Sequence, residues 1–281
     1  MAPTSSVHRE GGSAAMDMAE LIPTLPLETG SPPFPLRRYG GYWLLEWVLP
    51  GLEAVHTRFE PRPSDVFLAS FPKSGTTWLK ALAFATINRT TYPPSGDAHP
   101  LRHRGPHNCV KFFESTFAIS GEGGGGDGDR ITSAAADDGD SGCRIVYVCR
   151  DPKDAFVSMW LFTMSNKVKG VTTTTDEHHP AAAAAAPSIE QVFDLFCDGR
   201  SIAGPQWHHV RDIDSLRNVR ANRAGVTTDL AVRKESFFRR GVAGDWSNHM
   251  SPEMASRLDR VVEDALRGSG FTFGAAAGDS E

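Results

Sequence analysis

The sequence lacks the excess of positive charge that marks a general nucleic-acid binder. Its 281 residues carry a formal net charge of -5. Affinity for a nucleic-acid backbone rests on a strong positive field over the protein surface. Any recognition of phosphate must therefore be local, and we expect no nucleic-acid partner.

Cysteine is scarce and is not arranged for metal binding. The four cysteines are Cys109, Cys143, Cys149 and Cys197, and they form no CxxC pair and follow no metal-ligand spacing. We expect reduced thiols in a cytoplasmic protein and no bound metal.

Long apolar runs are also missing. No segment reaches the roughly 18 consecutive apolar residues that a membrane-spanning helix needs. The opening stretch MAPTSSVHREGGSAAMDMAE has neither the apolar centre of a signal peptide nor the Arg-rich pattern of a transit peptide. We expect a soluble protein without membrane contact.

What is present fits one α/β domain with irregular additions. Residues 1–35 are rich in Pro, Gly, Ser and Thr without a sustained period, which predicts a disordered tail. The domain is expected over residues 36–275, interrupted by low-complexity stretches at 119–142 and 170–188, and followed by a tail at 276–281.

Two segments are typical of a buried strand followed by a loop and a helix. The apolar run DVFLASF (Asp65–Phe71) precedes PKSGTTW and the helical pattern WLKALAFATIN. The run RIVYVCR (Arg144–Arg150) precedes DPKDAFVSMWLF, in which Asp151 can cap a helix that begins at Pro152. Two such units predict a three-layer α/β/α fold with a central parallel sheet.

Two further helices are predicted from the pattern of apolar residues. The stretch GGYWLLEWVLPGLEAVHTRF indicates a short helix ended by Pro50 and Gly51. The stretch SPEMASRLDRVVEDALRGSG indicates an amphipathic helix capped by Ser251 and ended by Gly268 or Gly270.

The loop FPKSGTTW has the composition of an anion cradle. It joins a strand to a helix, so the amides of Ser74 to Thr77 can point at one anion while Lys73 adds a full charge. The order differs from a Walker A loop, because the lysine precedes the glycine. A Mg²⁺-dependent nucleoside phosphotransferase is therefore disfavoured.

Two other segments can add to a phosphate site. Arg150 follows the second strand, where ligands gather in parallel sheets, and Ser158 lies two turns into the next helix. The loop FFRRGVAGDWSNH places two arginines before a glycine, which suits bidentate binding of phosphate. The alternatives are a structural ion pair of Arg150 with Asp151 or Asp154 and a solvated basic turn.

Together these segments carry a resemblance to a known family. SFPKSGTTWLKAL, CRDPKDAFVSMW and FFRRGVAGDWSNHM resemble the three nucleotide-binding signatures of the cytosolic sulfotransferases. RRYGGYW, PHNCVKFFE and GPQWHH are similar to supporting segments of the plant flavonol and brassinosteroid branch.

The resemblance implies transfer of a sulfuryl group from 3′-phosphoadenosine 5′-phosphosulfate (PAPS) to a hydroxyl of a flavonoid, steroid or other small acceptor, without a metal. It implies that Lys73 is catalytic, because its charge would stabilise the leaving phosphate. The cofactor-binding residues that it implies are Lys73, Ser74, Gly75, Thr76, Thr77, Trp78, Arg150, Ser158, Arg239, Arg240 and Gly241.

One departure from the family pattern concerns the catalytic base. The family carries a histidine between the segments that here read PHNCVKFFE and RIVYVCRDPKD, but Ala118–Gly142 contains neither histidine nor lysine. The histidine base is thus not found at its place. The other histidines are interpreted as surface or packing residues; those weighed as substitutes are His103, His107, His178, His179, His208, His209 and His249.

A second departure follows GPQWHHV (Gly204–Val210). Family members continue there through a helix and a strand, whereas this chain continues as RDIDSLRNVRANRAG. Each omitted stretch supplies a strand in the family, so the resemblance implies an incomplete sheet. The alternative function is a catalytically impaired relative that binds PAPS or its desulfated product (PAP). The family's dimer motif is not matched, which favours a monomer.

Overall fold

The computed structural model describes a large part of the chain. These residues are 18–31, 34–59, 62, 64–113, 144–167, 187–216 and 243–273. The low-complexity stretches lie outside the described residues, apart from Pro187 and Ser188, and so do Arg239, Arg240 and Gly241.

Three short strands form an antiparallel sheet in the order β1-β2-β3. They are β1 (Leu27–Glu28), β2 (Leu36–Tyr39) and β3 (Tyr42–Leu45). Gly40 and Gly41 turn the chain between β2 and β3 with φ of 58° and 90°. Glycine adopts such positive φ without steric cost, which permits a two-residue hairpin.

Ordered structure begins well before residue 36. Helix α1 (Met18–Leu21) and the 3-10 turn η1 (Ile22–Thr24) precede β1, and Met18 and Ile22 are buried beside Leu44 and Leu49. The prediction of a disordered tail over residues 1–35 is therefore wrong for the described part. Burial against distant residues stabilises this segment, and its composition alone does not reveal that burial.

The prediction of a helix that ends at Pro50 and Gly51 is also wrong. Residues 42–45 form β3, and after η2 (Glu46–Val48) the chain enters α2 (Leu49–Arg58), which includes both residues. Proline lacks an N–H, so it fits the first helical turn, where that donor has no partner inside the helix. Pro50 marks the start of a helix here.

The two predicted strand-loop-helix units are confirmed. Strand β4 (Val66–Ser70) pairs in parallel with β5 (Arg144–Val148), with Ala69 opposite Tyr147. The two carboxyl ends therefore meet at one edge of the pair. Within the described residues, β4 and β5 are the strands of this parallel sheet.

Each strand leads into a helix as expected. Helix α3 (Thr76–Ile87) follows β4, and α6 (Pro152–Lys167) follows β5. Asp151 caps α6, because its carboxylate accepts a hydrogen bond of 2.8 Å from the amide of Lys153. The predicted cap is confirmed.

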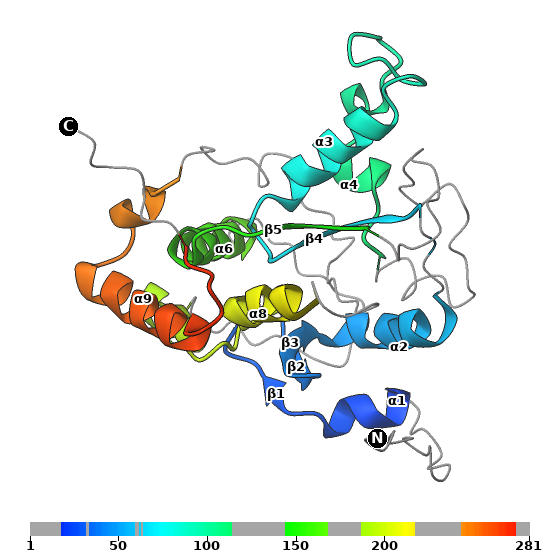
Figure 1. Cartoon of the computed structure of the whole chain (residues 1–281). Helices are drawn as coiled ribbons and strands as arrows, with labels where there is room; N and C mark the ends of the chain where they lie inside the picture. Colours follow the sequence, from blue (N-terminus) through cyan, green and yellow to red (C-terminus); the bar gives the residue numbers. More distant parts are fainter. Residues whose placement is uncertain are drawn as a thin grey trace, which may run out of the picture.

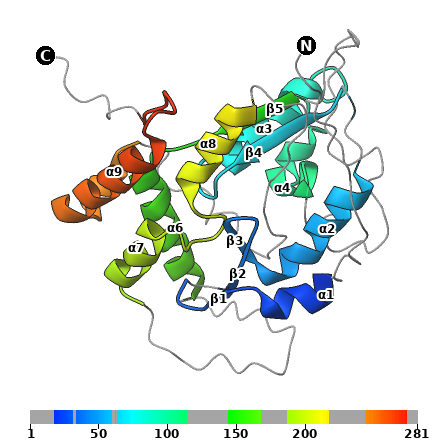
Figure 2. The same cartoon turned by 60° about the horizontal axis from the view of Figure 1, so that its bottom comes forward.

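Helices lie on both sides of the strand pair. Figure 1 shows α3 and α4 (Pro106–Cys109) on one side and α8 (Gln206–Leu216) on the other. In Figure 2, the view is turned so that the side with α8 comes forward, and α8 lies in front of the strands. The arrangement confirms an α/β fold with a parallel pair between helical layers.

The main core joins α6, α7 (Ile189–Cys197), α8 and α9 (Pro252–Leu266). Its largest fully buried members include Phe71, Phe156 and Phe196. Among the described residues, no helix is both long enough and apolar enough to cross a membrane.

The ends of α9 agree with the sequence analysis. The hydroxyl of Ser251 accepts a hydrogen bond of 3.3 Å from the amide of Met254, as expected of an N-cap. Gly268 and Gly270 follow the helix with φ of 82° and 74°. Because left-handed residues end helices, either glycine suits the stop.

Candidate functional site

The loop between β4 and α3 is tightly turned. The amide of Ser74 donates to the carbonyl of Phe71 at 3.1 Å, while Lys73 and Gly75 adopt φ of 66° and 109°. Glycine takes this conformation freely, whereas lysine rarely does. Such conformations gather at ligand sites, where the surrounding structure holds them in place.

The start of α3 provides the anion cradle that the sequence predicts. The first amide bonded within the helix is that of Leu79, which donates to the carbonyl of Gly75 at 3.0 Å. The amides of Thr76, Thr77 and Trp78 come before it, and no helical carbonyl precedes them. The helix dipole adds positive potential at this end. The Ser74 amide bonds within the turn, so the cradle begins after it.

Side-chain hydroxyls line the same loop. Ser74 is 5% exposed, and its buried Oγ has no hydrogen-bond partner among the described residues. The hydroxyls of Ser70 and Thr76 are hydrogen-bonded to each other. A buried hydroxyl without a partner is costly, which indicates a place for a polar ligand group.

A histidine on α4 holds one of these hydroxyls. Nε2 of His107 is hydrogen-bonded to Oγ1 of Thr77 at 3.0 Å, and its ring stacks on Phe112 at 4.6 Å between centroids. Burial, assisted by the charges of Lys80 and Lys73, lowers the pKa of His107 to about 4. The imidazole is therefore neutral at pH 7.

Lys73 connects the loop to the second strand-loop-helix unit. Its Nζ lies 3.9 Å from the centroid of the Phe162 ring on α6. The positive charge thus lies between the two units. Trp78 is 59% exposed on the first turn of α3, so one large aromatic surface borders the cradle.

Arg150 and Ser158 lie beside this unit. The guanidinium of Arg150 is 3.5 Å from the carboxylate of Asp154, which is one of the alternatives raised for it, and Ser158 is buried. Gln206, on the first turn of α8, donates a hydrogen bond of 2.7 Å to the carbonyl of Arg150. Arg150 is therefore positioned from two helices.

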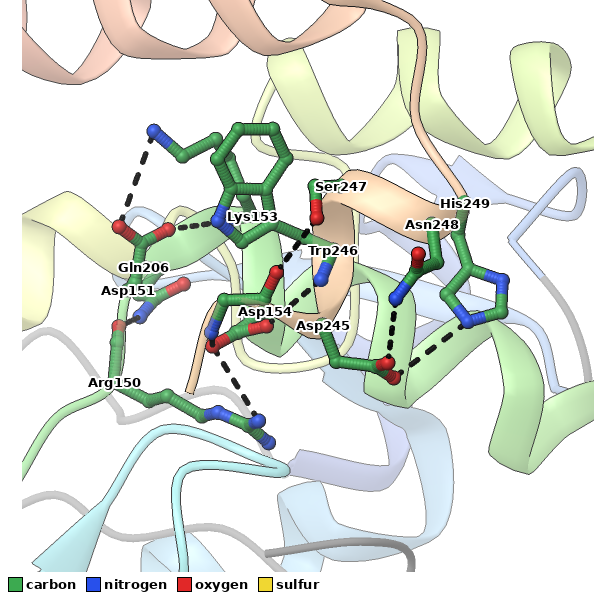
Figure 3. A network of polar contacts seen from close by, with 11 residues as sticks. Arg150, Asp151, Lys153, Asp154, Gln206, Asp245, Trp246, Ser247, Asn248 and His249 are labelled. Carbon is green, nitrogen blue, oxygen red and sulfur yellow. Dashed lines mark hydrogen bonds and ion pairs between the residues drawn. The ribbon is translucent and has the colours of Figure 1, made fainter. Parts of the chain in front are cut away.

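Asp154 ties the second nucleotide-binding segment to the third. Its carboxylate accepts hydrogen bonds from the amides of Gly244 at 2.8 Å and Trp246 at 3.2 Å, while the residue is 1% exposed. Figure 3 shows this carboxylate between Arg150 and Trp246. Because charged hydrogen bonds satisfy the buried carboxylate, the anchor is strong.

The chain around this anchor is also fixed. In η6 (Asp245–Asn248), the Asp245 carboxylate accepts a hydrogen bond from Asn248 at 3.1 Å and lies 3.6 Å from Nε2 of His249. Nζ of Lys153 lies 4.7 Å from the centroid of the Trp246 ring. The described end of the third segment, GDWSNH, is thus held against α6.

The structure brings most of the predicted residues into one region. Lys73 to Trp78 lie on one unit, and Arg150 and Ser158 lie on the other. The role of Gln206, and that of Asp154 beyond an ion pair, cannot be predicted from the sequence alone, because both depend on contacts with residues far along the chain. The position of Asp154 directly after CRDPK was the one feature of the sequence that pointed to its role.

Comparison with known proteins identifies the family. A family model described as sulfotransferase domain matches residues 63–224 and 212–270. The chain belongs to the sulfotransferase domain family. By family, the protein is therefore a transferase enzyme.

Individual relatives agree with this assignment. Cytosolic sulfotransferase 10 of Arabidopsis thaliana is 30% identical over 90% of this chain and 93% of its own length. Cytosolic sulfotransferase 17 of the same plant is 31% identical over 90% of this chain and 89% of its own. The crystal structure of an Arabidopsis thaliana putative steroid sulphotransferase is similar with a TM-score of 0.60 and 26% identity, covering 96% of this chain and 100% of that one.

These comparisons also support missing internal segments. The match to cytosolic sulfotransferase 10 extends over 325 aligned positions, more than the 281 residues of this chain, so the alignment must contain gaps in this chain. The family match is divided into two parts that overlap at residues 212–224. That division follows Gly204–Val210 closely, where the sequence predicts the second omission.

Proposed function

We propose that this sulfotransferase transfers a sulfuryl group from PAPS to a hydroxyl of a small acceptor such as a flavonoid, steroid or other phenol or alcohol. The observation that carries the proposal is the cradle at the start of α3, where helix amides and the buried Ser74 hydroxyl border Lys73. These groups fit a tetrahedral anion.

Residues of this chain can be assigned to the two ends of such a nucleotide, although Arg239–Gly241 lie outside the described residues. Lys73 and residues 74–77 would hold the 5′-phosphosulfate, and the exposed ring of Trp78 would lie against adenine. Arg150 and Ser158, joined by Arg239–Gly241, would hold the 3′-phosphate. PAPS supplies the activated sulfuryl group. Asp154 supports this assignment, because it holds Arg150 and the end of the third segment at one carboxylate.

The chain's own residues contribute electrostatic stabilisation. The charge of Lys73 and the amino end of α3 act where negative charge grows on the departing phosphate. His107 fixes the Thr77 hydroxyl toward a neutral ring nitrogen. We propose that the protein acts in the cytoplasm, because its relatives are named cytosolic. We also propose that it is a monomer, because its sequence does not match the family's dimer motif.

A second candidate function is a relative that binds PAP or PAPS without transfer. The observation that favours it is the absence of histidine and lysine from residues 118–142, where the family has its base. This candidate predicts nucleotide binding without a sulfated product.

A transfer assay with ³⁵S-labelled PAPS and a panel of phenols, flavonoids and steroids separates the two candidates. The proposed enzyme forms labelled product, and Lys73→Met reduces the rate by about 100-fold, because one stabilising charge is lost. Lys111→Met, which changes an exposed lysine, is the matched control and retains the rate. Product formation that is equal in both variants contradicts the role of Lys73. A folded protein that binds PAP but yields no product favours the second candidate.

A further inference from the structure

A histidine outside the family's base position lies where the two parallel strands end. His209, on the first turn of α8, packs its ring against Phe71 at 5.6 Å and Tyr147 at 6.5 Å between centroids. Phe71 directly follows β4, and Tyr147 lies near the end of β5. Ligands bind at this edge of parallel α/β sheets.

The same helical turn is tied to the proposed nucleotide site. Gln206, three residues before His209, donates its side-chain hydrogen bond to the carbonyl of Arg150. Phe71 precedes Lys73 by two residues. His209 is therefore attached through short links to the two residues that would hold opposite ends of the nucleotide.

The protonation pattern of His209 is fixed by its surroundings. Its Nε2 lies 2.6 Å from the carbonyl oxygen of Ala203. A carbonyl oxygen only accepts hydrogen bonds, so Nε2 carries the proton and donates it, and in the neutral ring the lone pair is on Nδ1. Ala203 is itself held, because its amide donates to the carbonyl of Trp43 at 2.8 Å.

Burial is the largest influence on the protonation of His209, and it favours a neutral ring. Burial lowers its pKa, against the raising effects of the Ala203 carbonyl and of Asp212. Asp212 accepts a hydrogen bond from the Tyr42 hydroxyl, and the Tyr42 ring meets His209 edge-on at 5.0 Å. The other titratable neighbours are His208 and Tyr147. A neutral imidazole with a fixed tautomer is suited to accept a proton.

We propose that His209 is the proton acceptor of this enzyme and takes the place of the base that residues 118–142 lack. This inference rests on the proposed function and revises the interpretation of His209 as a packing residue. During transfer, the acceptor oxygen forms a bond to sulfur, and the bond between sulfur and the bridging phosphate oxygen breaks. The acceptor's proton moves to Nδ1, and the electron pair of the broken bond leaves with PAP.

The test compares His209→Gln with the matched control His208→Gln, which changes the adjacent residue. Two acceptors are used, namely phenol, which is protonated at the assay pH, and 4-nitrophenol, which is largely ionised at a mildly alkaline pH. Loss of a base reduces transfer to phenol by about 100-fold or more, and reduces transfer to the ionised nitrophenol far less. His208→Gln leaves both rates unchanged. If His209→Gln only changes the shape of the pocket, both rates should fall equally. That result would overturn the proposal.

Two readouts besides activity complete the test. Titration with PAP should give the same affinity for wild type and His209→Gln, since His209 contacts no phosphate in this account. Nitrogen-15 NMR should show Nε2 of His209 protonated and Nδ1 unprotonated; the reverse pattern overturns the proposal. Wild type that binds PAP but sulfates neither phenol also overturns it, whereas wild type that does not bind PAP contradicts the proposed function itself.

Discussion

The helical core and the parallel strand pair differ sharply in how far they are covered. Phe156 and Leu258, on α6 and α9, are almost fully buried in the core. On β5, by contrast, Ile145 is 39% exposed and Val146 is 41% exposed. Parallel strands are normally buried on both faces.

This contrast separates the support of the proposed nucleotide site from the strand pair that leads into it. Arg150 and the described end of the third segment are fixed from the well-covered side, through Gln206 on α8 and Asp154 on α6. The strand pair leads into the loops of this site, but side chains of β5 are partly exposed. The support of the proposed nucleotide site is thus well packed, whereas β5 of the strand pair is partly exposed.

The largest effect should come from truncating the core. Leu258→Ala should lower the free energy of unfolding by about 2–5 kcal/mol, because it removes a buried side chain and leaves a cavity. Ile145→Ala on the exposed strand should lower it by about 1 kcal/mol or less. Urea denaturation measures both. Equal losses would show that β5 is as well packed as the core.

The next largest effect should come from Asp154, which anchors the third nucleotide-binding segment to the second. Asp154→Ala should lower the free energy of unfolding by about 3 kcal/mol, because a buried carboxylate with several partners is lost. Asp259→Ala provides the control, since this more exposed carboxylate pairs with Lys153 and should contribute at most about 1 kcal/mol. A loss from Asp154→Ala no larger than that of the control would contradict the anchor.

The smallest of these effects concerns pH. His107 has a pKa of about 4 when folded and 6.5 when unfolded, so the unfolded chain binds more protons between these values. Stability should therefore fall as pH decreases from 6.5 to 4; because the ring is partly exposed, solvent screening limits the contribution of this residue to about 1 kcal/mol or less. Denaturation of His107→Gln, which can keep the hydrogen bond to Thr77, should show a correspondingly weaker dependence. Identical pH profiles would exclude this contribution.

The sequence sufficed to predict the features that local pattern determines. The apolar runs before PKSGTTW and DPKD, the cap at Asp151 and the cap at Ser251 all follow from neighbouring residues. The contacts of Asp154 with Gly244 and of Gln206 with Arg150 join residues far apart in the chain, and one sequence does not show such pairs. Helix α1 was missed for the same reason, since distant apolar residues bury it.

Calorimetric titration of the wild type and of Arg150→Ala with PAP, with a melting curve of each protein, tests whether the nucleotide site is assembled. We predict that the wild type melts cooperatively and binds PAP, and that Arg150→Ala weakens binding by about 10- to 100-fold, because a charged contact to phosphate is lost. A wild type that melts cooperatively without binding PAP, or a variant that binds as tightly as wild type, would contradict the claim that the nucleotide site is assembled.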